Sequence, residues 1–162
     1  MPSALADDSK NPRRALREDG IPMKISARNV LAGTVQSVTK GAVNAEITLT
    51  LEGGDTMVAI ITNSSADSLQ LAAGKPAFAI VKASEVMIGK GVEAARLSAR
   101  NVLAGEVSKL QDGAVNSEVE VRLPGGTTMV ASITKQSVKA LELRQGDKVS
   151  AIVKASHVLV GV

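Results

Sequence analysis

The chain has few of the residue types on which metal-binding and many enzymatic sites depend. Its 162 residues include no cysteine, tryptophan or tyrosine, and only one phenylalanine and one histidine. Neither a cysteine- and histidine-ligated metal cation nor a disulfide-built secreted domain is therefore expected. No stretch approaches the ~18 apolar residues of a membrane span, and the N-terminus lacks the apolar segment of a signal peptide. We expect a cytoplasmic protein without a membrane partner.

What the chain does have is an internal repeat. The octapeptide Ser-Ala-Arg-Asn-Val-Leu-Ala-Gly occupies residues 26–33 and returns unchanged at residues 98–105. Later segments such as Gly-Ala-Val-Asn and Val-Lys-Ala-Ser recur in the same register, with no insertion between copies. The repeat predicts a flexible tail at residues 1–22, a first module at 23–89, a linker at 90–95 and a second module at 96–162.

Each copy has the apolar spacing of a small β protein. Segments 30–38 and 43–51 are rich in β-branched residues with stretches of alternation, and two shorter apolar runs follow at 57–62 and 77–82. A Gly-Gly pair at 53–54 is a hairpin signal that predicts antiparallel neighbours. The pattern predicts about five strands per copy.

One helical segment interrupts the strands at the same place in both copies. In the first copy Ser64 or Ser65 is expected to cap a short helix, and Gly74 to end it. This order predicts an all-β protein of two tandem, five-stranded barrels of the oligonucleotide/oligosaccharide-binding (OB) type, each with one short helix. A small β-sandwich is the alternative. A barrel of this size buries only ~60% of the surface of its unfolded chain, so the modules should pack together.

The residues suited to catalysis form no repeated constellation. His157 is the only histidine, and its counterpart in the first copy is Glu85. Glu46 and Glu118 occupy equivalent positions, but one carboxylate per module suits a turn or an interface better than an acid/base pair. We expect no enzymatic activity and no organic cofactor.

The two copies instead share donors suited to a tetrahedral oxyanion. Arginine supplies a fork of N–H donors, lysine a point charge, and serine or threonine neutral donors, while a helix start adds unpaired N–H groups. Any one of these side chains also suits a plain surface or capping role. The predicted oxyanion-binding residues are Ser26, Arg28, Thr62, Ser65, Lys82 and Ser84, with Ser98, Arg100, Thr134, Ser137, Lys154 and Ser156 at the equivalent positions.

These motifs resemble the molybdate-binding Mop, or molbindin, family, most closely its tandem form with two modules in one chain. The resemblance covers residues 23–162 and includes Met-Lys-Ile-Ser-Ala-Arg-Asn at 23–29, Ile-Thr-x-x-Ser at 61–65 and Val-Lys-Ala-Ser at 81–84. The second copy departs slightly, with Ser117 in Gly-Ala-Val-Asn-Ser-Glu.

The resemblance implies a ring of six modules, which for a tandem chain is a homotrimer. It implies molybdate or tungstate as the bound ligand at module interfaces, and it assigns the donors named above to those sites. Further oxyanion sites near the threefold axis are implied at Gly41, Val43 and Asn44, and at Gly113, Val115 and Asn116.

The resemblance also implies a function in molybdenum storage, buffering or homeostasis. Some family members carry a DNA-binding or ATPase domain, and the polar residues before the first module are too few to form either, so we expect the binding function alone. The alternatives are an OB-like protein that binds single-stranded nucleic acid and a purely structural assembly protein. Nucleic-acid binding relies on aromatic platforms, and Phe78 is the only aromatic residue, with Ser150 at its counterpart. Sequence spacing does not distinguish molybdate from tungstate or sulfate.

Overall fold

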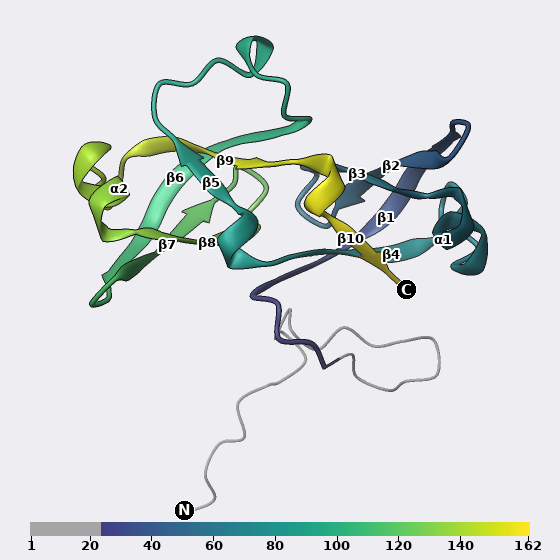
Figure 1. Ribbon diagram of the computed structural model, residues 1–162, viewed down its shortest axis with the longest axis horizontal. Coiled ribbons are helices and arrows are strands. Elements are labelled where there is room, and N and C mark those ends of the chain that lie inside the picture. Colours follow the sequence, from purple (N-terminus) through teal and green to yellow (C-terminus); the bar gives the residue numbers. More distant parts are fainter. Residues whose placement is uncertain (1–23) are drawn as a thin grey trace, which may run out of the picture.

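A computed structural model describes residues 24–162 of the chain, so the prediction of a flexible tail at residues 1–22 lies outside the described residues. Figure 1 shows two β modules side by side, each with one short helix at its outer end. The first repeat forms β1 (Asn29–Lys40), β2 (Asn44–Leu51), β3 (Thr56–Thr62), α1 (Asn63–Ser68), β4 (Pro76–Val81), the 3-10 turn η2 (Ala83–Glu85) and β5 (Met87–Gly89). After the turn η3 (Ala94–Arg96), the second repeat forms β6 (Asn101–Asp112), β7 (Asn116–Arg122), β8 (Thr128–Thr134), α2 (Lys135–Ala140), β9 (Lys148–Val153), η4 (Ala155–His157) and β10 (Leu159–Gly161).

The strands form because apolar residues alternate toward one face. In β2, Ala45, Ile47 and Leu49 are fully buried, while the residues between them are half-buried. This alternation directs every second side chain into the core and satisfies the period of a pleated strand. The predicted all-β class with two barrel-like modules is confirmed.

The two sheets exchange their last strands. The first module is the sheet β10-β4-β1-β2-β3, and the second module is the sheet β5-β9-β6-β7-β8. Leu159 of β10 pairs with Ile80 of β4, and Met87 of β5 pairs with Ile152 of β9, so each repeat supplies the short strand of the other module. In Figure 1 the yellow C-terminal segment crosses from β9 to lie beside β4. β10 also contacts β3, and β5 contacts β8, which brings the two edges of each sheet together as in a barrel.

The helix cap lies two or three positions before the predicted caps. Thr62, rather than Ser64 or Ser65, is the N-cap of α1, and its hydroxyl accepts a hydrogen bond from the backbone N–H of Ser65 at 3.0 Å. The helix ends at Ser68, well before Gly74. The cap was misplaced because an N-cap residue has the backbone angles of a strand, so the last residue of β3 can take this position, and threonine favours strands and also caps helices. Within residues 24–162 no helix is long and apolar enough to cross a membrane.

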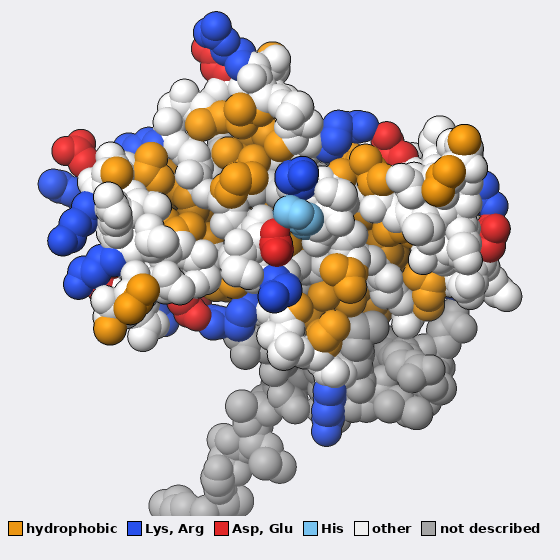
Figure 2. Space-filling view, viewed as in Figure 1, with side chains coloured by type: hydrophobic (Ala, Val, Ile, Leu, Met, Phe, Trp, Pro, Cys, Tyr) orange, Lys and Arg blue, Asp and Glu red, His pale blue; other side chains and the backbone are white. Residues whose placement is uncertain are grey.

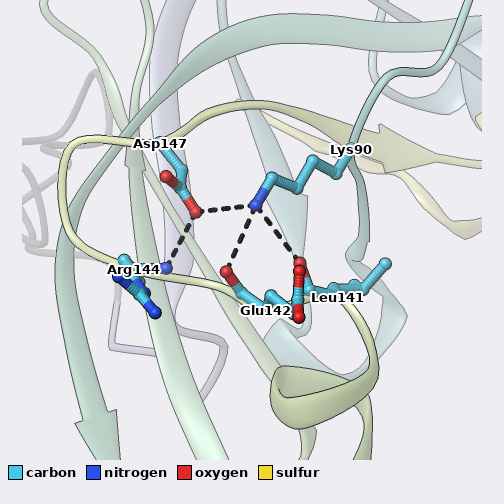
Figure 3. Close-up of polar contacts among 5 residues, drawn as sticks. All are labelled: Lys90, Leu141, Glu142, Arg144 and Asp147. Carbon is cyan, nitrogen blue, oxygen red and sulfur yellow. Dashed lines mark hydrogen bonds and ion pairs between the residues drawn. The ribbon is translucent and has the colours of Figure 1, made fainter.

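The linker is tied to the second module by one lysine. Lys90 Nζ donates to the carbonyl oxygens of Leu141 and Glu142, at 3.3 and 3.2 Å, and to Asp147 Oδ2 at 3.1 Å (Figure 3). The backbone N–H of Arg144 also donates to this carboxylate, and this bond, followed by the one from Lys90, lowers the pKa of Asp147. In the first module Lys75, the counterpart of Asp147, reaches the carbonyl of Leu69 itself at 2.7 Å. A cation thus neutralises the C-terminal carbonyls of both helices.

Candidate functional site

Two arginine–glutamate pairs cross the module interface. Arg28, just before β1, donates through Nη1 to Glu118 on β7. Arg100, just before β6, makes a two-bond pair with Glu46 on β2: Nη1 to Oε2 at 2.8 Å and Nη2 to Oε1 at 2.9 Å. A turn and an interface were both expected for Glu46 and Glu118, and these contacts place the two carboxylates at the interface.

The Arg100–Glu46 contact stabilises the charged form of both partners. The hydrogen bond from Arg100 lowers the pKa of Glu46 against a smaller opposing effect of burial, and the same bond raises the pKa of Arg100. Both side chains remain partly open to solvent, with 50% of Arg100 and 37% of Glu46 exposed. The pair is therefore formed but accessible to a solute.

Two asparagines beside these arginines hold the modules together. The Asn29 side chain accepts from the backbone N–H of Val130 at 2.7 Å and donates to the carbonyl of the same residue at 2.8 Å. Asn101 makes the equivalent pair of bonds with Val58. Both asparagines are buried. This role of the asparagines was not predicted, although both asparagines belong to the repeated Ser-Ala-Arg-Asn motif.

The predicted hydroxyl donors lie at the helix starts. Thr62 and Ser65 are joined by a hydroxyl hydrogen bond of 2.9 Å, and Thr134 and Ser137 by one of 2.8 Å. Arg100 reaches Glu46, whose register partner on β3 is Ile60, two positions before Thr62. The arginine of the second repeat thus contacts β2 of the first repeat two register positions from the residue that caps α1.

The predicted lysine motif of each repeat also lies against the other module. The turn η4, which Lys154 precedes, packs against β3, and η2, which Lys82 precedes, packs against β8. Asn101 of β6 pairs with Val153 of β9, and Arg100 and Lys154 are the next residues beyond this last pair of the two neighbouring strands. Ser84 and Ser156 lie in the two turns and are exposed. Ser26 and Ser98 are exposed in the segments that lead into β1 and β6.

The predicted axial residues form the turns between the first two strands of each repeat. The backbone N–H of Gly41 donates to the carbonyl of Asn44 at 2.8 Å, and Asn63 donates to the carbonyls of Val43 and Gly41. The turn is therefore attached to the start of α1. Val43 and its counterpart Val115 are 71% and 74% exposed. Gly113 and Asn116 close the equivalent turn of the second repeat.

The two repeats also meet at equivalent positions. His157 Nδ1 lies 2.8 Å from Glu85 Oε2, although the two residues are counterparts in the repeat. Figure 2 shows the histidine next to an acidic side chain in the middle of this face, with basic side chains above and below. Contact between counterparts indicates that the modules are related by an approximate twofold axis.

A separate cavity of about 550 Å³ lies between the linker and the second module. Val92 of the linker, Leu123 and Val149 supply apolar walls, and Lys148 and Arg122 are also among its lining residues. None of the predicted oxyanion-binding residues lines it, so the candidate site is the module interface rather than this cavity.

The fold and the interface define a class of protein: two interlocked five-stranded barrel modules that share paired arginine, lysine and hydroxyl groups. The profile described as "TOBE domain" matches residues 25–88 and 97–160, and the chain belongs to this family. Two tandem copies of this domain agree with the resemblance to the tandem molbindins.

Solved and curated relatives agree with this assignment. A structure of the cytoplasmic molybdate-binding protein ModG, with molybdate bound, is 51% identical and superposes with a TM-score of 0.83, covering 86% of this chain and 99% of that one. The molybdenum-pterin-binding protein MopA of Rhodobacter capsulatus is 43% identical over 88% of this chain and 54% of its own length. The molybdenum transport protein ModE of Herbaspirillum seropedicae is 40% identical over 86% of this chain and 52% of its own length. The chain thus spans about half the length of these two curated relatives.

Proposed function

We propose that this chain binds molybdate, or the nearly isosteric tungstate, at the module interface and acts as a cytoplasmic molybdenum store or buffer. The observation that carries the proposal is the arrangement of the repeated donors. The arginine of one repeat contacts β2 or β7 of the other repeat. The turn that follows its lysine packs against β3 or β8, the strands that lead into Thr62 and Thr134. The similarity to the molybdate-binding protein ModG, which covers nearly the full length of that chain, supports the same ligand.

The chemistry of such a site is reversible binding. The anion accepts charge-assisted hydrogen bonds from Arg28 or Arg100 and from Lys82 or Lys154, and neutral bonds from the threonine and serine hydroxyls. Because the donors come from two repeats, the bound anion joins the modules. Release follows from equilibrium dissociation as free molybdate falls, and no covalent step or organic cofactor is involved.

We further propose a homotrimer in which the axial residues of each repeat gather near a threefold axis. The proposal is supported by the exposed valines Val43 and Val115 in the two equivalent turns, since exposed apolar residues at loop tips suit burial against another copy.

The nucleic-acid alternative has less support. Phe78 is half-buried and packs with Ala27, Val30 and Ile80, so it offers no stacking platform.

The proposal is tested by isothermal titration of molybdate into the wild type and into the double variant Arg28→Ala/Arg100→Ala. We expect the double variant to lose at least tenfold in affinity for molybdate, because the charge-assisted hydrogen bonds from arginine to the anion are removed from each site. The control is Arg96→Ala, which removes an exposed arginine at the end of η3. Unchanged affinity in a folded double variant would refute the role of the two arginines.

A further inference from the structure

The arginines proposed to bind the oxyanion already hold carboxylates. Arg28 contacts Glu118 and Arg100 contacts Glu46, in both cases across the module interface. A carboxylate presents two oxygens to the guanidinium fork, as a tetrahedral oxyanion does. An incoming anion must therefore share the fork with the glutamate or displace it.

The two arginines are not held to the same extent. Arg100 uses both terminal nitrogens on the two oxygens of Glu46. Arg28 donates to a single oxygen of Glu118. Moreover, Arg28 Nε is shielded from solvent and has no hydrogen-bond partner among residues 24–162. A buried N–H without a partner is costly, so a ligand that accepts from it gains affinity.

We propose that Glu46 and Glu118 are internal counter-anions that compete with the oxyanion for Arg100 and Arg28, and that the Arg28 site fills first. This inference rests on the proposed function, because it concerns the affinity of the same interface sites. The lowered pKa of Glu46 agrees with it, since the carboxylate stays charged and in place at neutral pH. The glutamates thus set the oxyanion concentration at which each site loads.

Neutral glutamine variants separate competition from simple positioning. Glu46→Gln removes the competing charge but retains a side-chain oxygen of the same reach. The variant should bind molybdate about fivefold more tightly at the Arg100 site, the scale of a solvent-accessible ion pair. If Glu46 instead only orients Arg100, the same substitution weakens binding.

The experiment is a molybdate titration of the full chain by calorimetry, with native mass spectrometry to count the anions bound. The wild type is expected to show two affinities. Glu46→Gln should raise the weaker affinity, and Glu46→Gln/Glu118→Gln should raise both, the weaker one by more because Arg100 is released from two bonds and Arg28 from one. Glu52→Gln, an exposed hairpin carboxylate, is the matched control. Circular dichroism confirms that each variant is folded.

The outcomes distinguish this inference from the function on which it rests. A wild type that takes up no molybdate overturns the proposed function. A wild type that binds molybdate with one affinity, or a folded Glu46→Gln variant with equal or weaker binding, overturns only the counter-anion inference.

Discussion

Asn29 and Asn101 each take the place that a peptide group of a neighbouring strand has in a continuous sheet. Their amides pair with the N–H and C=O of Val130 and Val58, on the edge strands β8 and β3. Unpaired groups on an edge strand attract other chains, and an amide side chain satisfies them without extending the sheet. The side chain of one residue thereby joins the modules beside each proposed anion site.

Asn29→Ala should lower the free energy of unfolding by about 2 kcal/mol, because two buried bonds are lost and the backbone of Val130 is left unpaired. Urea unfolding followed by far-ultraviolet circular dichroism measures the change, since the chain has no tryptophan or tyrosine for fluorescence. Gln111→Ala, at an exposed position of β6, is the control. A loss no larger than in this control would contradict the role given to the amide.

Acid should weaken the Arg100–Glu46 pair in a defined range. The folded-state pKa of Glu46 lies below its ordinary value of 4.5, so the unfolded chain takes up this proton first as the pH falls. The stabilising contribution is complete above about 4.5 and is lost as the pH falls below it, through the folded-state pKa. The difference in unfolding midpoint between wild type and Glu46→Gln should therefore shrink below this pH. A difference that stays constant into strong acid would show that the charge plays no part.

At the scale of elements, the side chain of Lys90 holds the linker against the second module. Lys90 meets two carbonyls and Asp147 at the end of α2, a role that Lys75 fills alone in the first module. Lys90 is thus the contact that fixes the linker, which otherwise consists of exposed or half-buried residues.

Lys90→Met should increase hydrogen exchange in residues 90–97 while the strands of both modules keep their protection. The reason is that the substitution removes every hydrogen bond recorded for the Lys90 side chain but retains its length. Exchange mass spectrometry measures the effect, and Lys109→Met on β6 is the control. Equal exchange in both variants would mean that the linker is held by other contacts.

The elements themselves were largely predictable, but their exchange between modules was not. Alternating apolar residues predicted β2, and the Gly-Gly pair predicted the hairpin between β2 and β3. The helix start was misplaced because Thr62 ends a strand and caps a helix at once. The exchange was not predictable because β4 and β9 end in the same Ala-Ile-Val sequence, so β5 and β10 find equivalent partners in either module.

The candidate site was predictable in kind but not in its contacts. Repetition identified Arg28 and Arg100 as shared donors, and it left a turn or an interface as the role of the carboxylates Glu46 and Glu118. Their pairing across the modules depends on tertiary packing between segments far apart in the chain, which spacing does not encode.

At the scale of the whole molecule, neither module is complete in one repeat. Each sheet ends in a strand from the other repeat, and η2 and η4 carry the lysine motifs across with those strands. The exchange thus explains both the mutual dependence expected of such small barrels and the composition of the proposed sites.

Deleting residues 159–162, which contain β10, should destabilise the first module although the deletion lies in the second repeat. The backbone of β4 loses its pairing with Leu159 to Gly161, so hydrogen exchange should rise in β4 and β3. The pairing of β5 with β9 remains, and the second module should keep its protection. Exchange that rises mainly in the second module would contradict the strand exchange.

Native mass spectrometry of the purified protein, titrated with molybdate against an excess of sulfate, tests the central claim most directly. We expect a trimer that gains several molybdates despite the sulfate, and a trimer of Arg28→Ala/Arg100→Ala that gains fewer. A folded wild-type protein that takes up no molybdate would contradict the claim that the module interface is an oxyanion site.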